Sequence, residues 1–240
     1  MIGLIIDIET TRLLTGPGLD EPHDPKTGYL KDDREILEVG YIRVDDADKK
    51  IISHGTLYFY KPYFQIENEA QSIHGLTRDF LKQYENDFER NLIILNSLIQ
   101  KTLIIGKNSD RFDIPYITKF IDKHSKGLLD MRSAVSIAKV RDIYKNPFVY
   151  EPILFTYDVQ KAFKNTYKEL YYAKYGGVLS PQARGTLMDY IDVLNKQEEV
   201  DALYASLDKD RTTGAHGALY DCVATYVVWK ECMERGLIVR

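Results

Sequence analysis

The sequence predicts an α/β fold in which a mixed β-sheet is flanked by helices. Three observations lead to this prediction: three extended apolar segments come first, helical and extended segments alternate after them, and the composition is that of a globular protein. The chain has 240 residues, of which 44% are hydrophobic and 28% charged, with 15 Gly and 8 Pro. This length suits one α/β domain, so we expect a single domain over residues 1–240.

The first expected strand, MIGLIIDIETT, carries two acids inside an apolar run. Residues i and i+2 of a strand point to the same face, so Asp7 and Glu9 should lie side by side while Ile6 and Ile8 face the other way. Two like charges on a core strand repel one another and resist desolvation. We therefore expect something positively charged between them.

The next elements continue this sheet. Residues 15–34 concentrate Gly, Pro and Asp, which predicts a long surface loop. Residues 36–44 and 50–60 are predicted strands joined by the polar turn DDADK, and they form a meander with the first strand. Thr77 can cap a helix over TRDFLKQY, a second helix is expected in FERNLIILNSLIQ, and residues 102–106 form a short buried strand.

The C-terminal half continues with mostly helical segments. Helical periodicity is expected over residues 112–123, over 186–207 and from about Ala218 to Arg235, and residues 128–131 are a further strand candidate. A meander followed by strand–helix alternation favours a mixed sheet over a doubly wound parallel one. A five-stranded ribonuclease H-like architecture fits this order.

Composition argues against several classes of protein. The longest apolar stretches, such as residues 92–99, are far shorter than a bilayer requires, and the start has no basic region or cleavage site, so we expect an intracellular, cytoplasmic protein with no membrane partner. The formal net charge of −4 disfavours binding of long duplexes by bulk electrostatics. Cys222 and Cys232, ten residues apart on an expected helix, fit neither a zinc site nor a redox pair and are expected to be core thiols.

Two further stretches carry acids. Asp113, in IIGKNSDRFDIPYI, enters a helix near the end of a strand, where ligand-facing residues of α/β proteins usually lie. In TTGAHGALYDCVATYVVW, His216 lies five residues before Asp221. Taken singly, Asp113 could be a helix cap and His216 a capping or core histidine. Asp221 within an apolar helix is costly unless it is paired or bound to a metal.

Together these blocks resemble the DEDDh exonucleases, the family of the proofreading subunit of bacterial DNA polymerase III, RNase T and oligoribonuclease. DIETT resembles the family's D-x-E-T, KNSDRFD its H-N-x-x-F-D and HGALYD its H-x-x-x-x-D. EAQSIHGLTRDFL is similar to the family's segment with I-H-G-hydrophobic-T. The blocks cover residues 5–118 and 214–230, in the family's order.

The resemblance implies a set of site residues. The expected metal ligands are Asp7, Glu9, Asp113 and Asp221, with His216 as the general base, and these five are the expected catalytic residues. The expected substrate-binding residues are Thr10, Thr11, Asn108 and Phe112. Four carboxylates balance two Mg²⁺ or Mn²⁺ ions, and two cations about 3.5–4 Å apart can stabilise both the attacking and the leaving oxygen of a phosphodiester. A histidine suits the role of base because its unperturbed pKa is about 6.5.

Two departures from the family pattern are visible. Lys107 stands where many relatives carry His before the Asn, and it could contact a phosphate or extend to the surface, so it is left unassigned. Residues 132–185 make the gap between the second and third motifs long, and we expect them to be a helical insertion within the domain. Their basic and aromatic residues could line a groove for single-stranded substrate or form a solvated helical hairpin.

The implied function is a 3′-to-5′ exonuclease that releases nucleoside 5′-monophosphates from the 3′ end of single-stranded nucleic acid, with DNA favoured and a role in DNA replication or repair. An RNA exonuclease or an oligoribonuclease-like enzyme is the alternative, because recognition of the 2′-hydroxyl leaves no signal in this sequence. A non-catalytic subunit that binds a polymerase or another replication protein is a further alternative, and the oligomeric state stays open.

Overall fold

The structure is a computed structural model that describes residues 2–12, 34–99, 102–109, 112–125, 156–177, 179, 185–208 and 217–237. Three sequence predictions fall outside these residues: nearly all of the loop at 15–34, the strand at 128–131 and His216. The first part of the expected insertion, residues 132–155, also lies outside.

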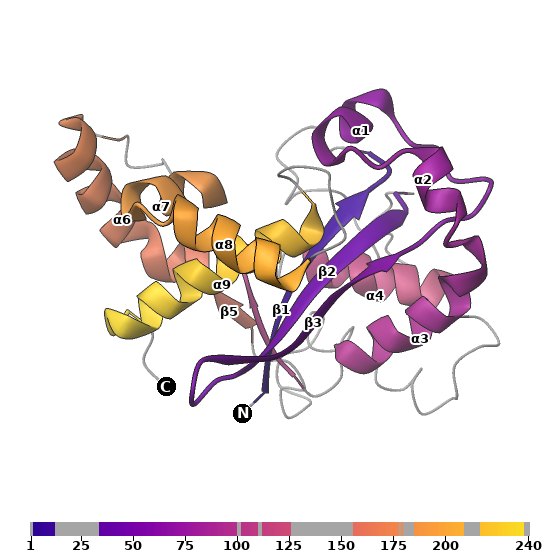
Figure 1. The fold of residues 1–240 in the computed structure, drawn as a ribbon, viewed down its shortest axis with the longest axis horizontal. Coiled ribbons are helices and arrows are strands. Elements are labelled where there is room, and N and C mark those ends of the chain that lie inside the picture. Colours follow the sequence, from indigo (N-terminus) through magenta and orange to yellow (C-terminus); the bar gives the residue numbers. More distant parts are fainter. Residues whose placement is uncertain are drawn as a thin grey trace, which may run out of the picture.

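A five-stranded mixed sheet forms the centre of the molecule (Figure 1). Its strand order is β3-β2-β1-β4-β5. β1 (Ile2–Thr10), β2 (Ile36–Asp45) and β3 (Lys50–Tyr58) form an antiparallel meander, and β4 (Leu103–Gly106) and β5 (Thr156–Asp158) continue in parallel from β1. The predicted mixed sheet is confirmed, although β5, only three residues long, was not predicted.

The helices flank this sheet. They are α1 (Asn68–His74), α2 (Arg78–Lys82), the 3₁₀ turn η1 (Glu85–Asp87), α3 (Phe88–Leu98), α4 (Asp113–His124), α6 (Val159–Tyr175), α7 (Leu187–Leu194), α8 (Gln197–Leu207) and α9 (Ala218–Glu234). As predicted, Thr77 caps α2, since its hydroxyl accepts a hydrogen bond from the Phe80 amide at 3.2 Å. α6 confirms the expected helical content between the second and third motifs. α1, which is only seven residues long, was not predicted.

The helical periodicity expected over residues 186–207 corresponds to two helices rather than one in the structure. Asn195 has a φ of 54°, in the left-handed region, so α7 ends there and α8 starts two residues later. Asparagine tolerates this conformation better than most residues. Lys174 of α6 holds the break in place, because its ammonium donates to the Asn195 side chain at 3.0 Å. Helical periodicity continues through the break and so conceals it.

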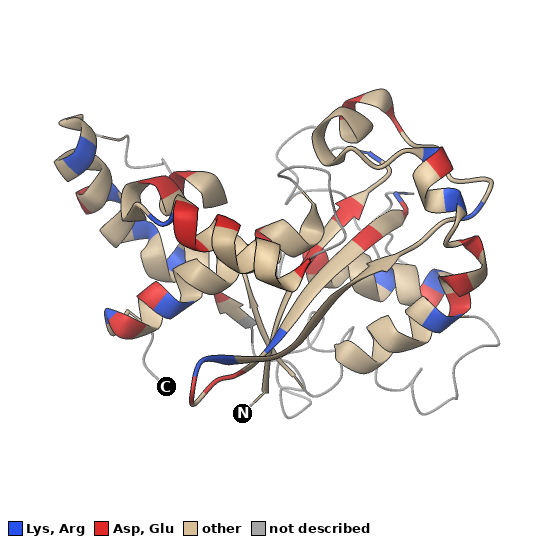
Figure 2. Cartoon of the chain, in the orientation of Figure 1, with Lys and Arg blue, Asp and Glu red and all other residues tan. Residues whose placement is uncertain are grey.

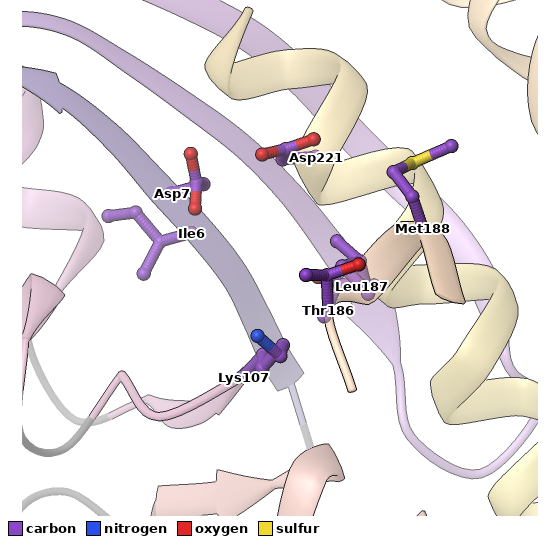
Figure 3. A pocket seen from close by; sticks show the side chains of 8 residues that line it. Ile6, Asp7, Lys107, Thr186, Leu187, Met188 and Asp221 are labelled. Atoms are coloured by element: carbon purple, nitrogen blue, oxygen red, sulfur yellow. The ribbon is translucent and has the colours of Figure 1, made fainter. Parts of the chain in front are cut away.

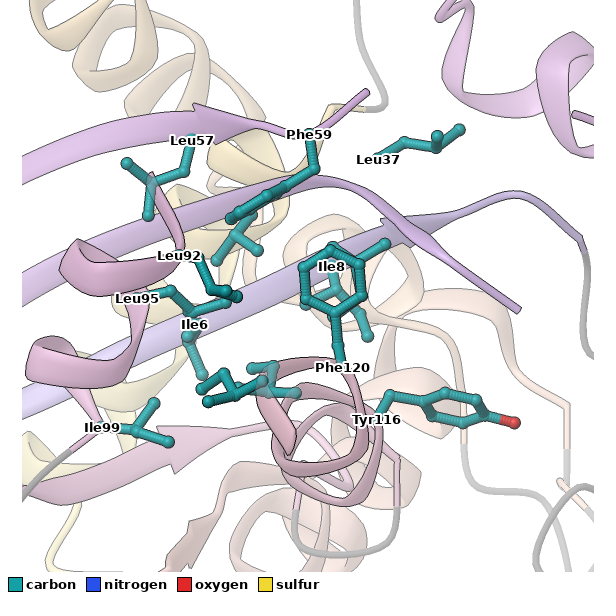
Figure 4. Close-up of a cluster of buried hydrophobic side chains, with 14 of the residues drawn as sticks. Ile6, Ile8, Leu37, Leu57, Phe59, Leu92, Leu95, Ile99, Tyr116 and Phe120 are labelled. Carbon is teal, nitrogen blue, oxygen red and sulfur yellow. The ribbon is translucent and has the colours of Figure 1, made fainter. Parts of the chain in front are cut away.

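The two faces of the sheet carry separate hydrophobic cores. Leu4, Ile6 and Ile8 of β1 pack with α3 and α4 in the first core (Figure 4). Ile5 of β1 packs with β4 and α9 in the second. Since side chains alternate along a strand, Asp7 shares the α9 face with Ile5. The predicted alternation of β1 is therefore confirmed.

Helix α9 lies between the sheet and helices α6, α7 and α8 (Figure 1). It is apolar almost all round and most of its side chains are buried, as expected of a central helix. Cys222 and Cys232 are both buried and free, which confirms their reading as core thiols. Among the described helices, none combines the length and the apolar character needed to cross a membrane.

Gly40 allows α9 to begin directly against β2. A Cβ at this position would lie 2.2 Å from the backbone carbonyl carbon of Ala218 and 2.3 Å from the Leu219 nitrogen. Gly40 is also the antiparallel partner of Asp7. A glycine here therefore brings the first turn of α9, which carries Asp221, next to the acids of β1.

Candidate active site

Acidic side chains from three distant stretches of the chain act electrostatically on Asp7 of β1. Asp7 and Glu9 lie on β1, Asp113 is the first residue of α4, and Asp221 lies in the first turn of α9. Acidic residues gather at the end of β1 and on the neighbouring part of β2 (Figure 2). Asp113 is almost fully buried, at 3% exposure.

The electrostatics of Asp7 show that these acids lie within reach of one another. Burial raises the pKa of Asp7 well above its usual value, and the charges of Asp221, Asp113, Glu9 and Glu38 raise it further, in that order. Burial likewise raises the pKa of Asp113 to about 7, and Asp221 acts in the same direction. The cluster therefore favours either bound protons or a bound cation.

Glu38 is an acid that the sequence analysis missed. It lies on β2 directly opposite Glu9 and is fully buried. Like charges placed opposite one another on neighbouring strands destabilise a sheet, so this pair adds to the strain of the cluster. A signal was present, since Glu38 interrupts the apolar run ILEVG just as Asp7 interrupts its own strand.

A pocket of about 280 Å³ opens beside these acids (Figure 3). Its lining comprises Ile6, Asp7, Lys107, Thr186, Leu187, Met188, Asp221 and Thr225. The carboxylates of Asp7 and Asp221 come from β1 and α9, and the Lys107 amino group is directed into the same space (Figure 3). Burial lowers the pKa of Lys107, while Asp221, Asp158, Asp189 and Asp7 oppose that effect. The protein thus places one positive side chain close to Asp7.

The hydroxyls of Thr10 and Thr11 are engaged within the protein. Thr10 donates to the Arg12 carbonyl at 2.7 Å, and the Thr11 hydroxyl accepts from the Glu35 amide at 3.0 Å. These bonds fix the chain where it leaves β1. A substrate contact by either residue stays a prediction, and it would fall to the backbone more readily than to the hydroxyl.

Asn108 and Phe112 shape the loop that leads to Asp113. Asn108 has a φ of 64°, and its backbone N–H donates to the Asp158 carboxylate at 3.3 Å. Phe112 is the N-cap residue of α4, and its ring contacts Tyr116 with centroids 5.0 Å apart. Their predicted roles in substrate binding stay predictions.

The predicted general base, His216, is not among the described residues. The next residue, Gly217, is the N-cap of α9, and its carbonyl accepts from the Asp221 amide at 3.2 Å. His216 therefore precedes by two residues the helix that carries Asp221. Its role stays a prediction.

The donor set suits a hard divalent cation, because every expected ligand is a carboxylate oxygen. One of these oxygens, Asp113 Oδ1, is buried without a hydrogen-bond partner. As the side chains stand, however, no three His, Cys, Asp or Glu among the described residues are placed so that they could hold a metal ion together. The chemistry of the donors fits a cation, and their convergence would require side-chain rotation.

Comparison with known proteins identifies the family. A family model described as Exonuclease (RNase T) matches residues 4–146, more than half of the chain. The chain belongs to this exonuclease family. The match runs from β1 through α4 and so includes Asp7, Glu9 and Asp113, while Asp221 lies beyond it. Membership makes the chain a nuclease of the hydrolase class and confirms the resemblance seen in its motifs. No curated protein matches the sequence.

Solved exonuclease structures share the fold of this exonuclease domain. Escherichia coli exonuclease I in complex with a dT13 oligonucleotide aligns with a TM-score of 0.54 and 17% identity over 98% of this chain and 41% of that chain. The zinc-bound form of the same enzyme with single-stranded DNA aligns with a TM-score of 0.51 and 18% identity, over 98% of this chain and 40% of that one. The nuclease domain of 3′hExo, described as a DEDDh family member bound to rAMP, aligns with a TM-score of 0.52 and 14% identity. This alignment covers all of this chain and 94% of that chain.

At these identities the likeness shows the fold alone. The exonuclease chain spans about two-fifths of the length of the exonuclease I chains and nearly all of the 3′hExo nuclease domain. The predicted ribonuclease H-like fold is confirmed.

Proposed function

We propose that this exonuclease removes nucleoside 5′-monophosphates from the 3′ end of single-stranded nucleic acid with the help of two divalent cations, Mg²⁺ or Mn²⁺. One observation carries the proposal: in a domain of the exonuclease family, carboxylates from β1, α4 and α9 act electrostatically on one another around Asp7. A fold without such chemistry would gain nothing from grouping these acids, of which Asp113 is buried and the others are partly buried.

Asp7, Glu9, Asp113 and Asp221 would hold the cations. When bound, the two cations would stabilise both the attacking and the leaving oxygen of the phosphodiester. The carboxylates contribute by giving up the protons that burial and mutual repulsion make them retain, and by rotating so that their oxygens converge. The unpartnered Asp113 Oδ1 supports this assignment, because a buried carboxylate oxygen without a donor is otherwise costly.

His216 would act as the general base. It precedes α9 by two residues, so it belongs to the segment that leads into the helix of Asp221. A neutral imidazole at this place would accept the proton of the attacking water, and the unperturbed pKa of a histidine side chain, about 6.5, suits that task.

Single-stranded DNA is the proposed substrate, and RNA is the second candidate. Exonuclease I, with the same fold, is described in complex with dT13, which supports a single-stranded DNA substrate. The 3′hExo nuclease domain, which this chain covers almost completely, is described as bound to rAMP. This supports RNA as the second candidate substrate. The acids retained in the cluster argue against a subunit that only binds a polymerase.

The proposal is tested by incubating the purified chain with 5′-labelled DNA and RNA oligomers of one sequence in Mg²⁺ or Mn²⁺. We expect stepwise shortening from the 3′ end and release of mononucleotides, faster on DNA. Asp7→Asn should abolish release, whereas Glu198→Gln, an exposed acid at the start of α8, should leave it unchanged. Equal release by the wild-type and Asp7→Asn proteins would point to a contaminating nuclease and refute the proposal.

A further inference from the structure

Lys107 is a basic residue that the family motif does not explain. It directly follows β4, and β4 pairs in parallel with β1 so that Ile105 lies beside Ile5. Extending this register by two residues, past the end of β4 at Gly106, would bring Lys107 level with Asp7. Lys107, which precedes Asn108 in the motif, therefore lines the same pocket as Asp7 and Asp221.

The surroundings of Lys107 distinguish it from an ordinary surface lysine. Lysines usually keep the ammonium group in water and bury only the stem. The Lys107 side chain is instead partly buried, and its amino group is directed into the pocket (Figure 3). Within the described part of the chain, no hydrogen bond or ion pair engages this ammonium group. The pocket thus contains a cation that no described carboxylate takes as a close partner.

The charge of the site suggests what this cation meets. In the proposed function, four carboxylates balance two divalent cations, so the negative charge of the bound phosphodiester is left over. A lysine ammonium is a compact point charge with three donors and is well suited to a phosphate oxygen. Lys107 lines the same pocket as Asp7 and Asp221, so its ammonium group faces the space that these carboxylates address.

We propose that Lys107 binds the scissile phosphate, which becomes the 5′-phosphate of the released mononucleotide; this inference rests on the proposed function. The pocket supports it. Its volume of about 280 Å³ is at the small end for a ligand site and suits a phosphate with its adjoining sugar. Leu187 and Met188 contribute apolar lining to the pocket beside these charged groups. Lys107 is then a substrate-binding residue at a position where many relatives carry His.

The competing role is that of a counter-charge that only offsets Asp7 and Asp221. The two roles differ in their effect on the product complex. A phosphate ligand contributes to the affinity for a nucleoside 5′-monophosphate in protein saturated with Mg²⁺. A counter-charge does not, because the cations already neutralise the carboxylates.

The test is calorimetric titration of Mg²⁺-saturated protein with a nucleoside 5′-monophosphate, which is a product and is not consumed. Lys107→Gln should weaken binding roughly tenfold or more, since hydrogen bonds to charged groups contribute about 1.5–3 kcal/mol. Lys107→Arg should stay within about threefold of the wild type. Lys50→Gln, an exposed lysine at the opposite end of the sheet, is the matched control and should have no effect.

Wild-type affinity in Lys107→Gln would overturn the inference, and so would a wild-type protein that binds no monophosphate. Thermal unfolding checks that each variant is folded, and Lys107→Met serves as a second neutral variant if Lys107→Gln is not. Release of mononucleotides by the wild type tests the proposed function separately. If release occurs while Lys107→Gln binds normally, the inference about Lys107 fails and the proposed function stands.

Discussion

Asp113 carries the clearest electrostatic consequence at the scale of single residues. Its carboxyl is buried, and burial raises its pKa to about 7, whereas an unfolded aspartate titrates near 3.9. Below about pH 4 the carboxyl is protonated in both the folded and the unfolded state, so it causes no loss of folding stability. Between about pH 4 and 7 the unfolded chain releases the proton while the folded protein retains it. The stability that Asp113 contributes is therefore lost as the pH rises through this window.

This gives a prediction for the metal-free protein. Asp113→Asn, which is neutral at every pH, should become more stable relative to the wild type from about pH 4 to 7 and then level off. The difference should reach on the order of 2–4 kcal/mol. Urea unfolding in chelator from pH 4 to 8 measures it. A difference that does not change with pH would contradict the burial of this carboxyl.

At pH 8, divalent cations should offset the loss of folding stability that the ionised, buried acids cause. A ligand that binds only the folded state at about one hundred times its Kd stabilises it by about 2.7 kcal/mol, or roughly 5–10 °C in Tm for a chain of this size. We expect such a rise with Mn²⁺ or Mg²⁺ for the wild type and little or none for Asp7→Asn. Glu198→Gln should respond like the wild type. Thermal unfolding with added cation or with chelator gives the comparison, and equal shifts in all three proteins would remove Asp7 from the cation site.

The residues of the site differ in how far the sequence reveals them. Asp7, Glu9, Asp113 and Asp221 were predicted because each stands in an apolar context within a recognisable motif. Glu38 stands in such a context without a motif of its own, so it was missed. Lys107 shares its pocket with Thr186, Leu187 and Met188, about eighty residues away along the chain. A local sequence pattern could not predict this arrangement, because it joins residues that are far apart along the chain.

At the scale of elements, the approach of α9 to β2 decides the geometry of the site. Gly40→Ala would place a methyl group 2.2 Å from the α9 backbone, so the helix must move away from the sheet. Overpacking of this kind costs typically about 1–3 kcal/mol. The helix carries Asp221, and a displacement of about 1 Å can cost about a hundredfold in rate. We expect kcat to fall by more than the loss of stability alone explains.

Gly177→Ala is the matched control, because a Cβ there would meet only Tyr171 at 3.9 Å. Activity on a single-stranded oligomer and urea unfolding, measured on both variants, separate the two effects. Normal activity in Gly40→Ala would mean that the register of α9 on the sheet does not set the site.

Elements with a clear period were predictable, and short or interrupted ones were not. The meander, α3, α4 and α9 follow from alternation or helical spacing. β5 has only three residues and is held by pairing with β4, which is a long-range contact. The end of α7 depends on one left-handed residue and on a lysine from α6. Tertiary contacts overrode the local pattern in both cases.

At the scale of the whole molecule, the two cores share one sheet. β1 gives Leu4, Ile6 and Ile8 to the first core and Ile5 to the second. Neither core can lose its side of β1 without disturbing the strand that positions Asp7. We therefore expect the cores to unfold together as one cooperative unit, in line with the single domain expected from chain length.

The single tryptophan makes this cooperativity measurable. Trp229 lies on α9, buried in the second core, whereas circular dichroism reports on both cores. Leu92→Ala, a fully buried change in the first core, should cost about 2–5 kcal/mol. It should lower the urea midpoint seen by Trp229 fluorescence as much as the midpoint seen by circular dichroism, although Leu92 and Trp229 lie on opposite faces of the sheet. Val228→Ala in the second core is the reciprocal control and should also shift both probes equally. If the urea midpoint seen by Trp229 fluorescence stays in place while circular dichroism shows two transitions, the two cores unfold as independent units. The acids of β1 would then lie at a boundary between units rather than on a shared strand.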